Sequence, residues 1–204
     1  MPHDHPDGVP QGFALPWRER LPMPDAASMS AAQRQAAEAL IAGPRKGVYG
    51  PFLPLLRSPE LLDRVARVGE YLRFDSVLDA RVRELVICAA SRHVSNQFEW
   101  LMHAPLAVKA GVAPATVEAL AAGARPRELP GDEEAALDFA RELLHTHGTS
   151  ELAYAAALLW FGEQGVVELA SLIGYFVMVS WLMNVAHTPA QASAQGDPLR
   201  AFPL

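Results

Sequence analysis

The sequence predicts an all-α protein. Two long tracts, residues 60–104 and 131–188, contain no proline and are rich in alanine, leucine and valine at helical spacing. Six of the 17 prolines fall within the first 24 residues, so we expect an irregular N-terminal arm over residues 1–25. Strand signals are nearly absent. The sequence therefore predicts one helical domain over residues 26–188, followed by a loosely ordered C-terminal tail over residues 189–204.

Caps and prolines divide the first half of this domain into helices. Ser28 or Ser30, Ser58 and Asp79 are typical N-cap residues, and a proline follows Ser58 at the first helical position. Residues 43–54 hold three glycines and three prolines, which predicts a loop. The expected helices cover residues 28–42, 59–74 and 79–94.

The second half contains more helices, separated by similar signals. Ser95 is the predicted cap of a helix that ends at Gly111, and Ser150 is the predicted cap of a later one. Pro105 lies inside the first of these helices, where we expect a kink. The expected helices cover residues 95–109, 114–122, 132–145, 150–161 and 163–187.

Residues 166–186 form an apolar segment that contains one charged residue, Glu168, and is long enough to span a bilayer. Neither flank carries the basic cluster or second span of a membrane protein. A helix that is apolar on all sides is otherwise a buried helix. We therefore interpret the segment as a core helix partly covered by neighbouring subunits, and expect a homo-oligomer with no membrane partner.

Charge and cysteine content exclude several classes of protein. The chain has 17 Lys and Arg against 23 Asp and Glu, a net charge of −6, and no basic run, so we expect no nucleic-acid partner. The single cysteine, Cys88, excludes an internal disulfide and a Cys-x-x-Cys redox pair. The polar start has no secretory pattern, and we expect a cytoplasmic location.

The candidate catalytic residues lie on one predicted helix. Asn96, Glu99 and His103 are separated by three and four residues and therefore share a helix face. A carboxylate beside an imidazole raises the imidazole pKa and fixes its tautomer, as in a general acid–base pair. The alternative is a solvated ion pair. The neighbouring Trp100 and Leu101 favour a buried helix, in which unpartnered polar groups are costly.

The preceding helix supplies two further candidates. Glu84 lies in an apolar run, but Arg81 and Arg83 are close enough in sequence to make an ordinary ion pair an equal interpretation. Cys88 lies in the same run and is interpreted as a buried small hydrophobe, not a nucleophile. Glu99 and His103 alone are too few ligands for a metal, so we expect no metal and no cofactor.

These residues resemble the carboxymuconolactone decarboxylase and alkylhydroperoxidase D superfamily. The match is carried by Arg83-Glu84-Leu-Val-Ile and by the stretch from Glu99-Trp100-Leu-Met-His103 to Gly111, within a core of about residues 45–123. The resemblance implies an alkylhydroperoxidase D-like helical bundle, with residues 132–187 as a second, degenerate half. It also implies association into dimers, trimers or hexamers.

The peroxidase branch of that family uses a glutamate, a Cys-x-x-Cys pair and a histidine four residues after the second cysteine. Glu84 and His103 match the glutamate and the histidine of this pattern. Asn96 and Glu99 occupy the two cysteine positions, so the dithiol is missing. Peroxide reduction through a disulfide requires a sulfur nucleophile. A peroxidase-like antioxidant function is therefore the disfavoured alternative.

The decarboxylase branch also lacks the dithiol, so the resemblance implies a cofactor-independent enzyme acting on a small organic acid or lactone. His103 is then the proton donor and acceptor, Glu99 orients it, and Glu84 is a second carboxylate. Two carboxylates disfavour a dianionic substrate. A non-catalytic helical oligomer remains the third alternative. The residues expected to bind substrate are Asn96, Tyr49, Arg45 and Trp100.

Overall fold

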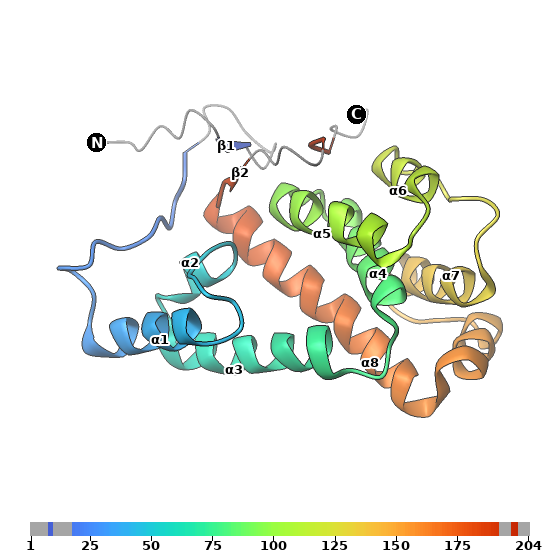
Figure 1. Cartoon of the computed structure of the whole chain (residues 1–204), viewed down its shortest axis with the longest axis horizontal. Helices are drawn as coiled ribbons and strands as arrows, with labels where there is room; N and C mark the ends of the chain where they lie inside the picture. The colour runs from blue at the N-terminus through green and yellow to red at the C-terminus, as the bar shows by residue number, and fades with distance from the viewer. Residues whose placement is uncertain (1–7, 10–17, 192–196, 200–204) are drawn as a thin grey trace.

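The computed structural model describes residues 8–9, 18–191 and 197–199, and helices dominate it (Figure 1). The all-α prediction is confirmed. Over these residues the only strands are the two-residue β1 (Gly8–Val9) and β2 (Ala190–Gln191), which pair antiparallel. The helical elements are α1 (Ala31–Ala42), α2 (Phe52–Leu55), α3 (Pro59–Glu70), the π-helical η1 (Tyr71–Asp75), α4 (Ala80–His93), α5 (Gln97–Ala110), α6 (Pro114–Ala121), α7 (Gly131–Thr146) and α8 (Glu151–Ala186).

Most predicted caps hold, with two exceptions: Ser58 stands at the N-cap of α3 but makes no side-chain hydrogen bond there, and Ser95 is not a cap. Ser30 caps α1 with a capping box, and the side chains of Asp79 and Ser150 cap α4 and α8. Ser95 does not cap α5. It has a positive φ of 51° in the turn after α4, and Asn96 is the cap, its side chain accepting a hydrogen bond from the backbone of Glu99. Asparagine is as good a cap as serine, and the turn selects between them.

Three boundaries differ from the prediction. The expected loop at residues 43–54 contains the short helix α2. The helix expected to reach residue 74 is α-helical only to Glu70 and continues as the π-helical η1. The last two expected helices are joined as α8, in which Gly162 has a φ of 67° and a ψ of 179°. These angles lie outside the helical region, so α8 bends sharply there.

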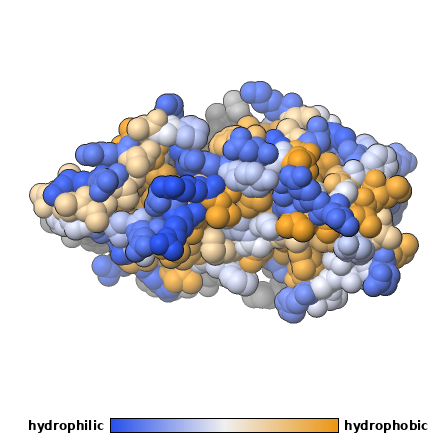
Figure 2. Space-filling model, turned by 90° about the horizontal axis from the view of Figure 1, so that it is seen from below, coloured by the Kyte–Doolittle hydropathy of each residue, from blue (hydrophilic) through white to orange (hydrophobic). Residues whose placement is uncertain are grey.

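Helix α8 runs through the centre of the molecule, with α3 on one side and α4 and α5 on the other (Figure 1). Its inner residues Leu172, Ile173 and Met183 are buried. Among the described helices, α8 alone is long and apolar enough to cross a membrane, and 56% of its most apolar window is buried inside the chain. Hydrophobic surface also remains outside, between charged side chains (Figure 2).

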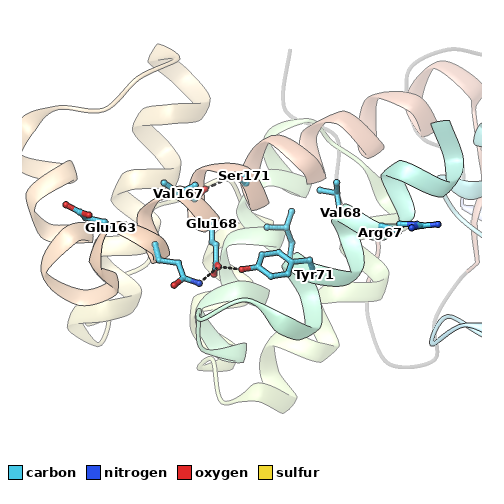
Figure 3. A pocket seen from close by; sticks show the side chains of 9 residues that line it. Arg67, Val68, Tyr71, Glu163, Val167, Glu168 and Ser171 are labelled. Carbon is cyan, nitrogen blue, oxygen red and sulfur yellow. Dashed lines mark hydrogen bonds between the residues drawn. The ribbon is translucent and has the colours of Figure 1, made fainter. Parts of the chain in front are cut away.

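A cavity of about 710 Å³ lies between α8 and the α3–η1 unit (Figure 3). The buried carboxylate of Glu168 lies in its wall and accepts hydrogen bonds from Tyr71 (2.5 Å), Gln164 (2.9 Å) and the backbone of Val77 (2.7 Å). Burial opposes the charged form, but these hydrogen bonds outweigh it and lower the pKa of Glu168. The residues lining this cavity are Arg67, Val68, Tyr71, Leu72, Glu163, Gln164, Val167, Glu168 and Ser171.

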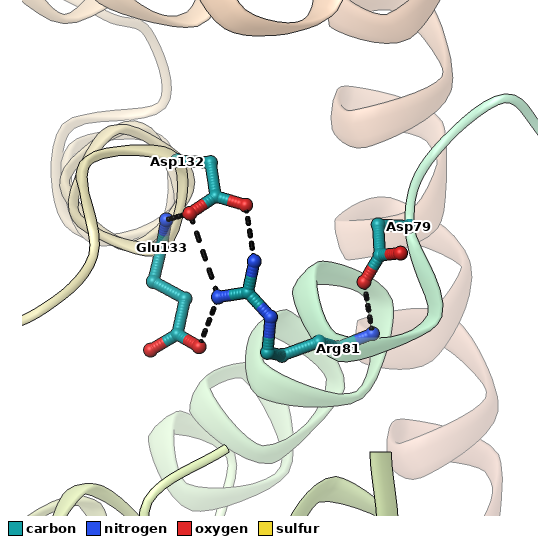
Figure 4. Close-up of polar contacts among 4 residues, drawn as sticks. All are labelled: Asp79, Arg81, Asp132 and Glu133. Carbon is teal, nitrogen blue, oxygen red and sulfur yellow. Dashed lines mark hydrogen bonds and ion pairs between the residues drawn. The ribbon is translucent and has the colours of Figure 1, made fainter. Parts of the chain in front are cut away.

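A charged cluster joins α4 to α7 (Figure 4). The guanidinium of Arg81 donates to Asp132 and to the buried Glu133, each at 2.5 Å. The hydrogen bond to Glu133 outweighs burial and raises the pKa of Arg81. Arg83, its neighbour, donates to the backbone carbonyl of Leu78. Arg81 and Arg83 are therefore engaged elsewhere, and the ordinary ion-pair interpretation of Glu84 is wrong.

The C-terminal segment is held against α5, whereas a loosely ordered tail was expected. The side-chain amide of Gln97 donates to the carbonyl of Leu199 at 2.7 Å and accepts from its N–H at 2.8 Å. The indole N–H of Trp100 donates to the carbonyl of Asp197 at 3.1 Å. Residues 197–199 thus cover the start of α5.

Candidate active site

Three of the predicted catalytic residues meet between α4 and α5. Helix α4 supplies Glu84, and α5 supplies Glu99 and His103. Nδ1 of His103 lies 2.6 Å from Oε2 of Glu84, and Nε2 lies 3.3 Å from Oε2 of Glu99. The tight turn between α4 and α5 folds the second helix back onto the first. One imidazole ring is thereby placed between two carboxylates, an arrangement we call the Glu–His–Glu triad.

The triad is buried, and Glu84 is its most exposed member. The side chains of His103 and Glu99 are 2% and 5% exposed, whereas that of Glu84 is 15% exposed. Burial opposes the charged imidazole, but the hydrogen bonds with Glu84 and then Glu99 outweigh it, so the pKa of His103 is raised. The ring of Phe176, on α8, packs nearly perpendicular to the imidazole with the two ring centroids 5.1 Å apart, and closes the site from that side.

The geometry suits proton transfer. Both ring nitrogens of His103 face carboxylate oxygens, so the imidazolium donates to Glu84 and Glu99 together. After the imidazolium has lost one proton, the neutral ring has one donor nitrogen and one acceptor nitrogen. It donates to one carboxylate and can accept a hydrogen bond from the other glutamate when that side chain is protonated. His103 is therefore a buried proton store, and Glu84 connects it to the more exposed end of the triad.

Sequence reasoning missed a fourth member, Tyr175 on α8. Burial raises its pKa to about 12, with Arg45 opposing this rise and Glu99 adding to it. A Cβ at Gly69 would lie 2.1 Å from the phenol oxygen, so this glycine makes room for the ring on α3. The signal in the sequence is one tyrosine within the apolar segment 166–186.

Two predicted substrate-binding residues instead hold helix ends. Asn96 is fully buried, and besides capping α5 its amide donates to the carbonyl of Ser180 at 3.2 Å and to Oδ1 of Asn184 at 2.9 Å. Trp100 is buried, with its single N–H bonded to the C-terminal segment. The hydrogen-bond donors of both side chains are thus engaged within the protein, which does not favour either residue as a donor to a substrate.

The other two predicted binding residues lie on the 43–54 segment. The guanidinium of buried Arg45 donates to Glu70 at 2.6 Å and to the Ala66 carbonyl at 3.1 Å. These two hydrogen bonds join it to α3 and not to Glu84, Glu99 or His103. The hydroxyl of half-exposed Tyr49 donates to the carbonyl of Arg45 at 3.1 Å. Arg45 therefore contributes positive charge near the triad, while Tyr49 lies at the surface.

The structure gives no support to Cys88 as a nucleophile. Cys88 is fully buried, and burial, followed by the charge of Glu84, raises the pKa of its thiol well above the ordinary value. A thiol in this state is a poor nucleophile. Among the described residues, no group of three His, Cys, Asp or Glu side chains is placed to hold a metal ion. The 710 Å³ cavity is lined by none of the triad residues.

Comparisons with known proteins place this geometry in context. Residues 59–142 match the model of the carboxymuconolactone decarboxylase family. A search of curated proteins gives no significant match. These 84 residues cover α3 to most of α7 and include the whole Glu–His–Glu triad.

Solved structures share the fold at low identity. A protein of unknown function from Agrobacterium tumefaciens, described as a putative antioxidant defence protein AhpD, is 16% identical, with a TM-score of 0.60 over 68% of this chain and 96% of its own. An alkylhydroperoxidase AhpD core protein from Ralstonia eutropha JMP134 is 20% identical (TM-score 0.67; 83% and 91% covered). A peroxidase-related protein from Silicibacter sp. TM1040 is 16% identical (0.67; 93% and 98%).

Proposed function

Because residues 59–142 match the carboxymuconolactone decarboxylase family and the fold is that of alkylhydroperoxidase D-like structures, we propose that the chain is a decarboxylase-like enzyme acting on a small organic acid or lactone. The observation that carries this proposal is the buried His103, hydrogen-bonded by a carboxylate at each ring nitrogen. Burying three ionisable side chains costs folding free energy. Such groups cluster at catalytic sites, where they serve in general acid–base chemistry.

Each residue of the triad has a distinct role in the proposed reaction. Loss of CO₂ breaks the bond between the carboxylate and its neighbouring carbon, and the electron pair passes into the conjugated carbonyl of the substrate. A proton must then reach that carbon. The imidazolium of His103 passes its proton to the carboxylate of Glu84 across 2.6 Å, and Glu84, the most exposed of the three, delivers it to that carbon. Glu99 balances the imidazolium charge, and solvent restores the proton through Glu84.

The charges around the triad restrict the substrate. Two carboxylates and one imidazolium carry a net charge of −1, and the nearby Arg45 is already paired with Glu70. A dianion would meet repulsion that no free cation offsets among Glu84, Glu99, His103 and Arg45. We therefore assign a monoanionic substrate to this site, whose one carboxylate is the group lost as CO₂.

The two alternative functions are less consistent with the site. A one-cysteine peroxidase requires an accessible thiolate, whereas Cys88 is fully buried and its pKa is raised. A non-catalytic bundle would leave the Glu–His pairs as ordinary surface ion pairs, whereas Glu99 and His103 are both almost completely buried.

The test is turnover of a panel of unsaturated lactones and small carboxylic acids, including 4-carboxymuconolactone, measured by CO₂ release and loss of absorbance. We expect activity on a monoanionic member and its loss in His103→Gln. Cys88→Ala is the matched control and should retain full activity. Peroxide turnover that disappears in Cys88→Ala would instead support the peroxidase function, and no turnover of any member would reject the proposed reaction.

A further inference from the structure

One face of α8 beyond Gly162 is uncovered and uncharged. Between Val167 and Val185, the exposed residues recur at alternating intervals of four and three positions. We call this row the α8 seam. The spacing is that of a helix–helix contact in a coiled coil. The members of the seam are Val167, Ser171, Gly174, Met178, Trp181 and Val185.

The α8 seam lies opposite the face that closes the candidate active site. Phe176, which contacts His103, is two residues from both Gly174 and Met178 and therefore points to the other side of the helix. Val167, Trp181 and Val185 are 65%, 59% and 64% exposed. A row of this kind is costly to leave in water, and it is continuous along the helix for about five turns.

The seam is complementary to itself. If two copies of α8 run antiparallel about a twofold axis level with Phe176, Val167 faces Val185, Ser171 faces Trp181, and Gly174 faces Met178. Each large side chain then meets a small or medium-sized one. No heavy atom lies within 4 Å of a Cβ built on Gly174, so the position has room for the opposing methionine. Pairing of large with small residues is how helices interlock.

This register also assigns an occupant to the 710 Å³ cavity. Ser171 and Val167 line the cavity, and Ser171 is the position opposite Trp181 in the antiparallel pair. A tryptophan leaving water needs an acceptor for its N–H. Glu168 and Gln164 line the cavity, and Figure 3 shows the carboxylate of Glu168 in its wall. The cavity therefore offers both the apolar lining and the acceptor that an indole requires.

The surface beside the seam is wide enough for an interface. Exposed apolar side chains continue across the cavity on α3 and η1, at Leu61, Val68, Tyr71 and Phe74. With the seam, they form one apolar surface that extends over α8 and the α3–η1 unit, and a standard interface buries ~800 Å² of such surface per chain. We propose that a second copy of this chain packs antiparallel on the α8 seam, and that the partner subunit's Trp181 enters the cavity.

A lipid bilayer is the other possible cover for an apolar helix face. The cavity beside the seam, however, is lined by Arg67, Glu163 and Glu168, and a bilayer would enclose these charges in hydrocarbon. A second copy leaves Arg67 and Glu163 at the polar rim of an interface, where charged residues are common. The charges beside the seam thus favour the protein partner.

The first test is the mass of the full-length chain in solution by light scattering, for matched variants. We expect the wild type to be a dimer or a multiple of two. Val185→Glu, on the seam, should halve that mass, whereas Val108→Glu, at an exposed valine of α5, should leave it unchanged. Circular dichroism checks that both variants are folded. A monomeric or trimeric wild type, or a folded Val185→Glu variant of unchanged mass, would overturn the proposal.

The second test is the register. In a Cys88→Ala background, the double variant Val167→Cys with Val185→Cys should form a disulfide-linked dimer on mild oxidation. Neither single variant should form the disulfide-linked dimer. In this register, a cysteine at position 167 or 185 lies about 27 Å from the same position of the partner subunit. Cross-linking by the single variants would indicate parallel helices, and no cross-linking by the double variant would exclude the register. Either result contradicts the proposal, as would binding to phosphatidylcholine vesicles that Val185→Glu abolishes.

Discussion

Nδ1 of His103 lies 2.6 Å from Oε2 of Glu84, although 19 residues separate them in sequence. The two side chains come from different helices, α4 and α5, and Glu99 occupies the second ring nitrogen. The imidazole is therefore held on both sides by groups that favour its protonated form.

This relationship predicts how stability depends on pH. Since the pKa of His103 is raised in the folded protein, the folded state binds its proton more tightly than the unfolded state does. The resulting stabilisation is fully present below the ordinary pKa of 6.5 and is lost as pH rises through the higher folded value. Denaturant unfolding from pH 5 to 9 should show this loss. The loss of stability with rising pH should be smaller in Glu84→Gln than in the wild type. An equal loss in the two proteins would contradict the raised pKa of His103.

Substitutions in the triad should separate proton transfer from binding. We expect His103→Gln to lower kcat by about 10²–10⁴-fold, the usual contribution of a general acid–base group. Glu84→Gln should lower kcat to a similar extent, because it removes the exposed end of the relay. Tyr49→Phe, at the surface, is the control and should change kcat less than twofold. A change confined to KM in His103→Gln would indicate binding alone.

Gly69 and Tyr175 should be coupled energetically. Gly69→Ala places a methyl group where the phenol oxygen lies, and we expect it to lower the free energy of unfolding by about 1–3 kcal/mol through overpacking. Tyr175→Phe removes that oxygen. In the Tyr175→Phe background, Gly69→Ala should therefore lower the free energy of unfolding by less than it does in the wild type. Additive effects in this double-mutant cycle would show that the two residues do not interact.

Two arginine clusters give a contrast between buried and exposed charge. Arg81→Ala leaves the buried carboxylate of Glu133 without its partner, and should lower the free energy of unfolding by about 3–5 kcal/mol. Arg125 pairs with the exposed Glu134 and Asp138, and Arg125→Ala should cost less than about 1 kcal/mol. Similar losses in urea unfolding for the two variants would contradict the structural role of the α4–α7 cluster.

The thiol of Cys88 should be unreactive in the folded protein. Burial keeps it protonated and inaccessible, so we expect modification by 5,5′-dithiobis(2-nitrobenzoic acid) only at the rate of unfolding. In urea the same thiol should react within the dead time of a manual assay. Rapid reaction of the native protein would reopen the thiol-based alternative.

Local signals in the sequence were sufficient for the helices. Proline spacing and N-cap residues located most boundaries, because caps and prolines act within one turn of the chain. The choice of Asn96 over Ser95 as the cap of α5 depends on the positive φ of Ser95. That angle is set by how α5 folds back onto α4, which no local pattern reveals.

The candidate site was predicted in part. The spacing of Glu99 and His103 within one helix is a local feature, and the position of Glu84 came from the family resemblance. The contribution of Tyr175 depends on α8 crossing α3 at Gly69, and that of Trp100 on the C-terminal segment folding over α5. Contacts between segments so far apart in sequence leave no periodic signal.

The pKa of His103, measured by NMR titration of its ring protons in full-length protein, tests the central claim most directly. The Glu–His–Glu triad predicts a value above 6.5 in the wild type and a lower value in both Glu84→Gln and Glu99→Gln. A wild-type pKa at or below 6.5, or one that neither substitution lowers, would contradict a proton store held between two carboxylates.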